Sequence, residues 1–560
     1  MRKKILKERK QNKRRQDDLD LILDNLPDEK EQERERRQIR RELEQEEMLL
    51  AEERRRARDI QNSQKNEEGA VKRKSQKNEE ETEVRKKGKR KKKPNRLTNK
   101  EITRVTYMFV TLFLIMAGYL VYFNVFESKD AVNSVYNVRQ DLLAERVVRG
   151  KILDRNGNVL AQTVTAEDGT ETREYPYGSM FAHVVGYSVK GKAGIESIQN
   201  FNLLTSNAFF VEKLINEFQD QKNIGDNIVT TLDADIQAAA YNALGNNKGA
   251  AVVMEASTGK ILAMVSKPSY DPNTVAVNWE TLINDTDSAL YNRATQGQYT
   301  PGSVFKIVTT LAYMRQNPDY AAYLHECSGE ITEDGTTIHC YNSTVHGQET
   351  LGDAVANSCN TAFSEIGLYL DIDKWQDTAE DLLFNKALKC DLTSNQSSFS
   401  LEKDADAAEI MMTAMGQGET MVSPYHMALI TSAIANGGTL MKPYLVEEIT
   451  NYTGTIVKEY MPEKYTTLMT SEEASVLKDY MEGVVSYGTG TSLNGLGYTV
   501  AGKTGTAEVS MDKNVVHSWF MGFSNVDNPD IVVSVVVENA DTSSVTGTSV
   551  AKQIFNAYYN

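Results

Sequence analysis

The feature that most constrains this chain is a run of 22 uncharged, mostly apolar residues at positions 105–126. As an α-helix the run would be about 33 Å long, enough to cross a hydrocarbon core of about 30 Å. Tyr107, Tyr119 and Tyr122 lie toward its ends, as is typical of membrane interfaces. A buried helix of a soluble protein fits a run of this length poorly, and a cleaved signal peptide would not follow 104 residues. The run therefore predicts an uncleaved transmembrane anchor.

Charge is divided unevenly about this anchor. Residues 1–104 carry 35 Lys and Arg and 24 Asp and Glu, a net charge of +11, whereas the other 456 residues carry 28 and 54, a net charge of −26. A basic cluster at residues 85–93 lies just before the anchor. The positive-inside rule therefore places the N-terminus in the cytoplasm and the larger part outside it. The cluster would also attract anionic lipid, at about 1 kcal/mol per basic residue, but topology alone explains it.

Residues 1–104 are predicted to form a cytoplasmic head of low complexity. The sequence SQKNEE at 63–68 recurs at 75–80, and dense mixed charge leaves few apolar residues for a core. We expect disorder with transient helix, including a solvated charged helix over 43–60. The functional alternative is a docking site for a cytoplasmic division or elongation factor.

Three short motifs indicate the chemistry of the C-terminal part: Ser303-Val304-Phe305-Lys306, Ser358-Cys359-Asn360 and Lys503-Thr504-Gly505-Thr506. A serine hydroxyl needs a nearby base to become a good nucleophile, and a lysine three residues later on a helix lies on the same face. Thr300-Pro301-Gly302 precedes an apolar stretch, so Ser303 is predicted at a helix N-terminus, where developing negative charge is favoured. A Ser-x-x-Lys pair alone often occurs by chance in an ordinary exposed helix. The order and spacing of all three motifs make a chance match improbable.

Motifs of this kind, in this order, occur in penicillin-binding proteins and serine β-lactamases. From residue 149 to the C-terminus the chain resembles the class B penicillin-binding proteins, the monofunctional transpeptidases of bacterial cell-wall synthesis. Further matching stretches lie at 149–157, 249–272, 346–347, 416–418, 487–491 and 517–520. The resemblance implies a peptidoglycan D,D-transpeptidase that cross-links stem peptides and is inhibited by β-lactams.

The resemblance implies that Ser303 attacks the penultimate D-alanine of a stem peptide and forms an acyl-enzyme. Lys306 would take the hydroxyl proton, with its pKa lowered by desolvation and by the nearby cation Lys503. Ser358 would relay the proton to the leaving amine, while Asn360 would hold Lys306 and the substrate backbone.

The third motif is expected to form a strand along the wall of the cleft. By the same resemblance, Lys503, Thr504 and Thr506 would bind the terminal carboxylate of the substrate, and Gly505 would let its backbone approach closely. The N–H groups of Ser303 and Thr506 would form the oxyanion hole.

The pattern of elements predicts an α+β fold for residues 226–560, in which strands from both ends of the domain share one antiparallel sheet flanked by helices. Strands are expected at 228–232, 249–254, 498–502, 517–524 and 531–538, and a helix at 233–244. Residues 127–225 combine strand-like pieces at 147–153 and 158–163 with a helical pattern at 207–218, which predicts a short pedestal of the family's dimerisation type. This pedestal leaves no room for a glycosyltransferase domain, so a polytopic membrane glycan polymerase is the expected partner.

The four cysteines are too few for a disulfide scaffold. Cys327 and Cys340 flank a turn-rich stretch and form the plausible disulfide pair outside the cytoplasm, whereas Cys359 is expected to pack in the core. The six histidines lack metal-ligand spacing with neighbouring acids, and no glycine-rich phosphate loop precedes a helix. The sequence therefore predicts no metal, no cofactor and no nucleic-acid partner.

Other functions remain open at this point. A D,D-carboxypeptidase or β-lactamase would use the same acylation chemistry with water as the acceptor, although the anchor and the lack of an identifiable deacylating acid argue against a β-lactamase. A penicillin-sensing receptor should have a signalling domain in place of the charged head, and a wall-complex scaffold would not need every catalytic position. The sequence leaves open a role in elongation, division or sporulation, the acceptor amine and the oligomeric state.

Overall fold

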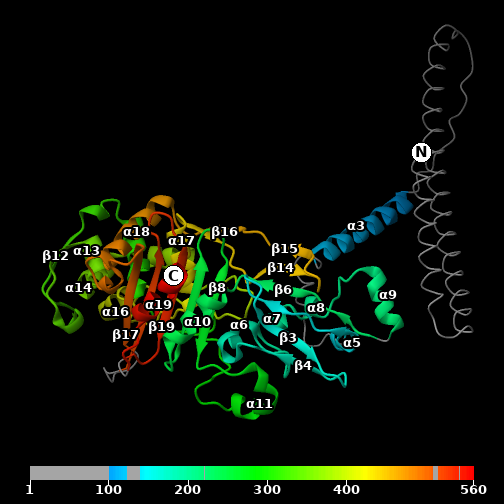
Figure 1. Cartoon of the computed structure of the whole chain (residues 1–560). Coiled ribbons are helices and arrows are strands. Elements are labelled where there is room, and N and C mark those ends of the chain that lie inside the picture. The colour runs from blue at the N-terminus through cyan, green and yellow to red at the C-terminus, as the bar shows by residue number, and fades with distance from the viewer. Residues whose placement is uncertain (1–99, 123–138, 220, 509–514, 541–542) are drawn as a thin grey trace, which may run out of the picture. The chain divides into compact units, whose positions relative to one another are not determined.

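The computed structural model describes residues 100–122, 139–219, 221–508, 515–540 and 543–560 (Figure 1). The predictions for the charged head therefore fall outside the described residues, apart from positions 100–104. The same holds for residues 123–126 of the predicted anchor and for residues 127–138 of the predicted pedestal.

Helix α3 (Lys100–Tyr122) contains residues 105–122 of the apolar run that the sequence singled out. Its stretch Thr103–Tyr122 is long and apolar enough to cross a membrane, and none of it is buried in the protein. Among the residues that the structure describes, α3 is the one helix that meets these criteria. A single candidate membrane span is thus present where it was predicted, while its orientation stays a prediction.

A five-stranded antiparallel sheet forms the centre of the C-terminal part, in the order β17-β18-β19-β7-β8. Its strands are β7 (Gly249–Glu255), β8 (Ile261–Lys267), β17 (Val500–Glu508), β18 (Val516–Ser524) and β19 (Ile531–Val537). Strand β19 pairs with β7 along its whole length, with Val533 opposite Val253. Figure 1 shows the green strand β8 close to the red C-terminal strands. The prediction that both ends of the domain share one antiparallel sheet is confirmed, but the strand predicted at 228–232 is β6 (Asn227–Thr230), which belongs to a second sheet.

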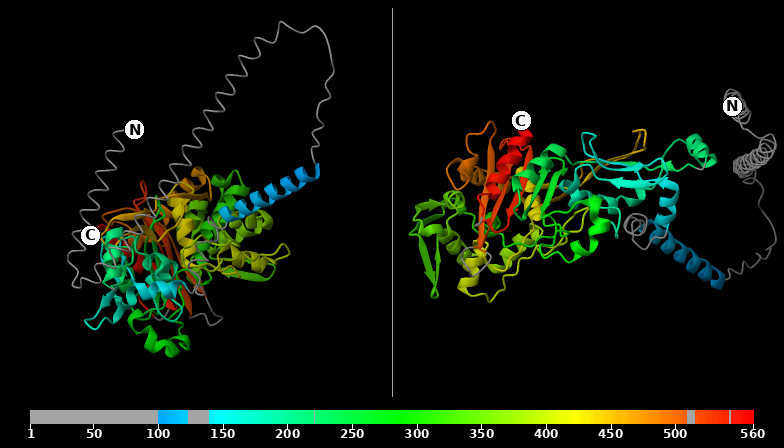
Figure 2. Two further views of the ribbon diagram at one scale, coloured as in Figure 1. Left: turned by 90° about the vertical axis from the view of Figure 1, so that its right-hand side faces the viewer. Right: turned by 60° about the horizontal axis from the view of Figure 1, so that its bottom comes forward.

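Helices cover both faces of this sheet, so every residue of β19 is buried. Helices α10 (Ala234–Leu244) and α19 (Gly547–Tyr559) pack on one face, where Phe555 contacts Phe520 with ring centroids 6.3 Å apart. Helix α17 (Pro424–Ala435) lies against the other face, and all its residues are buried (Figures 1 and 2). A strand covered on both sides reads as a continuous apolar run, which explains the sequence IVVSVVV of β19.

The remaining helices form the part of the domain that carries two of the motifs. They are α12 (Lys306–Gln316), α13 (Leu351–Ala356), α14 (Asn360–Tyr369), α15 (Ile372–Asp381), α16 (Ala407–Ala414) and α18 (Ser471–Ser486). Helix α11 (Val275–Ile283) lies apart from them and packs against Tyr187 through Trp279 (Figure 1). Phe305, directly before α12, packs against Phe384 and Phe399, with ring centroids 5.8 and 6.1 Å away. This aromatic contact fixes the start of α12 within the core.

Four short strands lie between α12 and α13: β9 (Leu324–Cys327), β10 (Glu330–Glu333), β11 (Thr336–His339) and β12 (Gly347–Thr350). Strand β9 pairs with β12, and β10 forms a hairpin with β11. Two further small pairs join β1 (Val147–Val148) to β5 (Asn223–Ile224), and β13 (Thr439–Met441) to β16 (Lys464–Thr467).

A second sheet lies in the region predicted as the pedestal, with the strand order β15-β14-β6-β2-β3-β4. Its strands are β2 (Ile152–Leu153), β3 (Val159–Thr165), β4 (Glu171–Glu174), β6 (Asn227–Thr230), β14 (Val446–Thr450) and β15 (Ile456–Glu459). Short helices accompany it: α5 (Arg139–Arg146), α6 (Ala182–Val185), α7 (Gly194–Ile198), α8 (Asn200–Leu203) and α9 (Phe210–Phe218). The sheet takes strands from both sides of the predicted boundary at residue 225, and that boundary stays a prediction.

Candidate active site

Ser303 lies in a 3₁₀ turn, η4 (Gly302–Phe305), which leads directly into α12. Gly302 has φ +56°, and a Cβ there would lie 2.5 Å from the carbonyl oxygen of Thr506. Its N–H donates to the carbonyl of Gly416 over 2.8 Å. Only glycine fits this close approach, which brings the partly exposed Ser303 against strand β17. The helix start was predicted here, although its first turn is 3₁₀ rather than α.

Lys306 begins α12 and is fully buried. Its ammonium group donates to the main-chain oxygen of Ser358 over 2.7 Å, to Asn360 Oδ1 over 2.7 Å and to Ser358 Oγ over 3.2 Å. The first and second motifs thus meet at one nitrogen. Burial lowers the pKa of Lys306 to about 8, because removal from water disfavours the charged form.

Ser358 occupies the connection between α13 and α14 with φ +58°, a conformation that costs a residue with a side chain about 1–2 kcal/mol. Asn360 is the first residue of α14, and its amide nitrogen donates to the carbonyl oxygen of His339 over 2.9 Å. Cys359 between them caps α14, since its sulfur accepts from the N–H of Ala362 over 3.5 Å. Asn360 is therefore held by the start of α14 and by β11, while Ser358 lies in the connection just before that helix.

The third motif lies on β17, which is an edge strand of the main sheet. Lys503 is fully buried, and its ammonium group donates to the carbonyl of Thr504 over 3.0 Å. Burial, and then the positive charge of Lys306, hold the pKa of Lys503 well below its usual value. Desolvation and the charge of Lys503 were both expected to lower the pKa of Lys306; of the two, burial is the cause that lowers it.

Gly505 allows a close contact within the protein. A Cβ at this position would lie 3.0 Å from Cβ of Trp519 and 3.1 Å from Cγ1 of Val304. The contact seen at Gly505 is thus with the turn of Ser303, and its predicted contact with substrate stays a prediction. Of the side chains predicted to bind a carboxylate, Thr504 is half-buried and Thr506 exposed, whereas Lys503 is fully buried beneath them.

Two candidate site residues, Thr489 and Gln417, were not identified from the sequence. Oγ1 of Thr489 lies 2.6 Å from Oγ1 of Thr504, and Gln417 Nε2 donates to the carbonyl of Thr506 over 3.4 Å. Both belong to stretches noted only for their resemblance, at 487–491 and 416–418. The resemblance of these stretches to the family did not assign a function to Thr489 or Gln417, because their contacts with β17 arise only in the folded protein.

The disulfide expected between Cys327 and Cys340 is absent from the structure. Cys327 and Cys340 are neighbours, but both thiols are free and their sulfurs are 3.7 Å apart. A disulfide has a sulfur–sulfur distance of about 2.05 Å. Cys359 is buried, as predicted.

Comparison with known families shows where this geometry belongs. Residues 249–560 match the penicillin binding protein transpeptidase domain, and residues 149–228 match the penicillin binding protein A dimerisation domain. The chain belongs to the penicillin-binding protein transpeptidase family. The resemblance noted in the sequence is thereby confirmed for this penicillin-binding protein.

Named relatives cover most of the chain. The peptidoglycan D,D-transpeptidase PbpA of Mycolicibacterium smegmatis is 30% identical over 496 residues, covering 82% of this chain and 98% of the relative. Stage V sporulation protein D of Bacillus subtilis is 30% identical over 439 residues, covering 73% of this chain and 65% of that protein.

Solved structures agree with the fold. Penicillin-binding protein A from M. tuberculosis, as a ceftriaxone acyl-enzyme complex, has a TM-score of 0.68 and 28% identity, covering 75% of this chain and 100% of that one. The D,D-transpeptidase domain of a peptidoglycan glycosyltransferase from Eggerthella lenta has a TM-score of 0.66 and 33% identity, covering 74% of this chain and 98% of that one. The predicted penicillin-binding transpeptidase fold is therefore present.

Proposed function

We propose that this penicillin-binding protein is a peptidoglycan D,D-transpeptidase that acts through an acyl-enzyme on Ser303 and is inhibited by β-lactams. The observation that carries the proposal is the buried ammonium group of Lys306, held by Ser358 and Asn360 at the base of the turn that bears Ser303. Strand β17 closes the other side of that turn. The D,D-transpeptidase relatives and the acyl-enzyme structures of similar proteins support this assignment.

In the acylation step, neutral Lys306 accepts the proton of Ser303 while Oγ attacks the carbonyl carbon of the penultimate D-alanine. With a pKa of about 8, roughly a tenth of Lys306 is neutral at pH 7. The N–H groups of Ser303 and Thr506 stabilise the oxyanion, and one such donor is typically worth about 100- to 1000-fold in rate. The proton then passes through Ser358 to the leaving amine as the peptide C–N bond breaks.

Substrate orientation is assigned to β17. Lys503 with the hydroxyls of Thr504 and Thr506 binds the terminal carboxylate, and the open edge of the strand pairs with the substrate backbone. An amine of a neighbouring stem peptide then attacks the ester carbonyl, forms the cross-link and releases Ser303. Water in place of the amine would make the enzyme a D,D-carboxypeptidase.

The test incubates the full-length protein in detergent with lipid-linked pentapeptide glycan strands and analyses the muropeptides by mass spectrometry. Cross-linked dimers are expected. Trimmed monomers alone would assign a carboxypeptidase, and no reaction would favour a sensor or scaffold. Ser303→Ala should abolish labelling by a fluorescent penicillin, and stoichiometric labelling of that variant would overturn the nucleophile.

We place residues 1–104 in the cytoplasm, the anchor at 105–126, a pedestal at 127–225 and the transpeptidase domain at 226–560, outside the cytoplasm. The basic cluster at 85–93 supports this orientation.

A polytopic membrane glycan polymerase is the proposed partner. An apolar surface on the pedestal supports it: Phe209, Phe210 and Phe218, at and within α9, are 77%, 75% and 64% exposed. Exposed apolar patches of this kind mark interaction sites. Co-purification of a polymerase with the intact chain, lost in a Phe210→Glu variant, is expected; equal recovery with that variant would refute this surface.

A further inference from the structure

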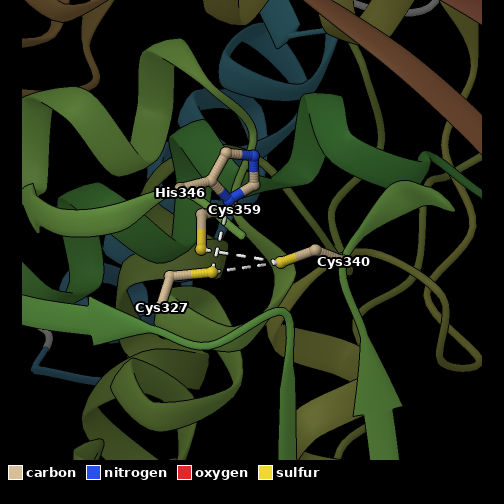
Figure 3. A group of neighbouring side chains, drawn as sticks. All are labelled: Cys327, Cys340, His346 and Cys359. Carbon is tan, nitrogen blue, oxygen red and sulfur yellow. Dashed lines mark hydrogen bonds between the residues drawn. The ribbon is translucent and has the colours of Figure 1, made fainter. Parts of the chain in front are cut away.

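Three cysteines and one histidine converge beside the second motif, where β9, β11 and β12 meet the start of α14 (Figure 3). Cys327 ends β9, Cys340 follows β11, His346 precedes β12 and Cys359 caps α14. Their ligand atoms, three sulfurs and one imidazole nitrogen, all lie within 4.8 Å of one another. Four side chains from four separate positions thus point at one small volume.

The distances fit a tetrahedral metal site. Sγ of Cys340 lies 3.7 Å from Sγ of Cys327 and 3.7 Å from Sγ of Cys359. Sγ of Cys327 lies 3.3 Å from Nδ1 of His346. In a zinc site with Zn–S bonds of about 2.3 Å and Zn–N bonds of about 2.0 Å, neighbouring sulfurs are about 3.8 Å apart and sulfur and nitrogen about 3.5 Å apart. These three pairs are within about 0.2 Å of such separations, and the other pairs lie within 4.8 Å.

A buried carboxylate beside the cluster also calls for a cation. Glu349 is 1% exposed, and its Oε2 has no hydrogen-bond partner among the described residues. That oxygen lies 4.0 Å from Nδ1 of His346, while Oε1 accepts from Nδ2 of Asn357 over 2.8 Å. A buried carboxylate oxygen without a partner is costly unless positive charge lies nearby. A divalent ion between the sulfurs and His346 would offset part of the negative charge that three thiolates and this carboxylate bring together.

We propose that Cys327, Cys340, His346 and Cys359 bind one Zn²⁺ ion. Three thiolates and an imidazole in tetrahedral arrangement are the ligand set of structural zinc sites, and thiolate ligands disfavour magnesium or calcium. A disulfide would use two of the sulfurs, but it would not explain why His346 lies among them or why the buried Glu349 is beside them. The sequence alone predicts no metal, because Cys327 and Cys340 form a plausible disulfide pair and the histidines lack neighbouring acids at metal-ligand spacing.

The ion would position the second motif from two sides. Cys359 lies between Ser358 and Asn360, and Cys340 follows His339, whose carbonyl accepts the hydrogen bond from Asn360. A metal bound to Cys359 and Cys340 therefore fixes both partners of that hydrogen bond, and Asn360 in turn holds Lys306. This positioning step rests on the proposed function, whereas metal binding does not.

Metal binding is tested on the full-length protein in detergent, reduced, equilibrated with a small excess of Zn²⁺ and desalted. About one zinc per chain is expected by elemental mass spectrometry. The Cys390→Ser variant, which changes the cysteine outside the cluster, should retain zinc, and His346→Ala should lose most of it. Co²⁺ in place of Zn²⁺ should give thiolate-to-cobalt charge-transfer absorption and visible bands of a tetrahedral site.

Less than a fifth of a zinc per chain, or no such cobalt spectrum, would overturn the site in the wild-type protein without relying on any variant. A disulfide between Cys327 and Cys340, mapped by mass spectrometry in freshly isolated protein kept free of reductant, would overturn it as well. The conservative His346→Cys variant keeps a zinc ligand and should retain the metal.

The positioning step is tested by fluorescent-penicillin acylation before and after zinc removal. Chelation should slow acylation at least tenfold, re-addition of Zn²⁺ should restore it, and His346→Cys should acylate far faster than His346→Ala. Equal rates in stripped and loaded protein would refute positioning. If loaded protein binds zinc but never acylates, the proposed function fails while the zinc site stands.

Discussion

The ammonium group of Lys306 donates to the side-chain oxygen of Asn360 over 2.7 Å, so the second motif holds the base of the first in place. The amide nitrogen of Asn360 is simultaneously bound to the carbonyl of His339. Because Asn360 is neutral, it orients Lys306 without stabilising the charged form as a carboxylate would.

Acylation should therefore depend on pH through Lys306. Burial lowers its pKa to about 8, and the neutral form is the base, so the active fraction grows as pH rises and is nearly complete above that value. The acylation rate with a fluorescent penicillin should rise about tenfold per pH unit below 8 and level off above it. A flat profile between pH 6 and 9 would exclude Lys306 as the base.

Replacing Asn360 by Asp should move that profile to higher pH. A carboxylate next to the ammonium group favours the charged form, and such a pair raises a lysine pKa by about 1–3 units. For Asn360→Asp we expect acylation at pH 7 to fall at least tenfold and to recover in alkaline solution. The exposed Asn284→Asp variant is the control and should keep the wild-type profile.

Gly302 should tolerate no side chain. A Cβ there would lie 2.5 Å from the carbonyl oxygen of Thr506, whereas a Cβ at Gly437, with φ +59°, meets nothing within 4 Å. Gly437→Ala should lower the free energy of unfolding only by the strain of its backbone conformation, about 1–2 kcal/mol. Gly302→Ala should cost ~2 kcal/mol more in the free energy of unfolding and abolish acylation, because the overlap displaces Ser303. Thermal unfolding and penicillin labelling of both variants test this prediction. Equal losses of stability and equal labelling of Gly302→Ala and Gly437→Ala would contradict it.

Thr489 should support substrate binding through Thr504. Thr489→Val keeps the side-chain shape but removes the hydroxyl that lies 2.6 Å from Oγ1 of Thr504. Loss of one such bond costs about 0.5–1.5 kcal/mol, which corresponds to a rate about two- to tenfold lower. The second-order rate constant of acylation measures the effect, and Thr455→Val on an exposed turn serves as the reference.

Glu196 should stabilise the pedestal without affecting chemistry. It is buried and receives hydrogen bonds from Arg149 and Arg173, and these charges lower its pKa against the opposing effect of burial. Glu196→Gln should lower the free energy of unfolding by about 3–5 kcal/mol, as when one partner of a buried ion pair is removed. Glu171→Gln, in the partly exposed pair with Lys222, should cost under about 1 kcal/mol.

The same carboxylate gives a pH dependence of stability. Because the folded-state pKa of Glu196 lies below the usual 4.5, its contribution is present above that value and is lost as pH falls through the folded pKa. The wild-type unfolding temperature should therefore decline more steeply in acid than that of Glu196→Gln. Parallel curves for the two proteins would show that Glu196 does not contribute in this way.

The sequence located the motifs because each is a contiguous pattern with its own chemistry. Ser303 before an apolar helix and Lys503 on a strand depend on local order, and both were predicted on elements of the correct type. Cys327 and Cys340 were expected to be neighbours, but the approach of Cys359 to them was not predicted, since a separate connection and helix α13 lie between. The pairing of Ile449 with Ile228 was missed as well: a strand was predicted at 228–232 but none around Ile449, and a local pattern does not identify a strand's distant neighbour.

That pairing has a mechanical consequence. In the second sheet, Ile228 lies between Ile152 on one side and Ile449 on the other. A pull on the anchor side of the chain is therefore carried into the catalytic part by rows of main-chain hydrogen bonds loaded in parallel, and not by the single covalent link at residue 225.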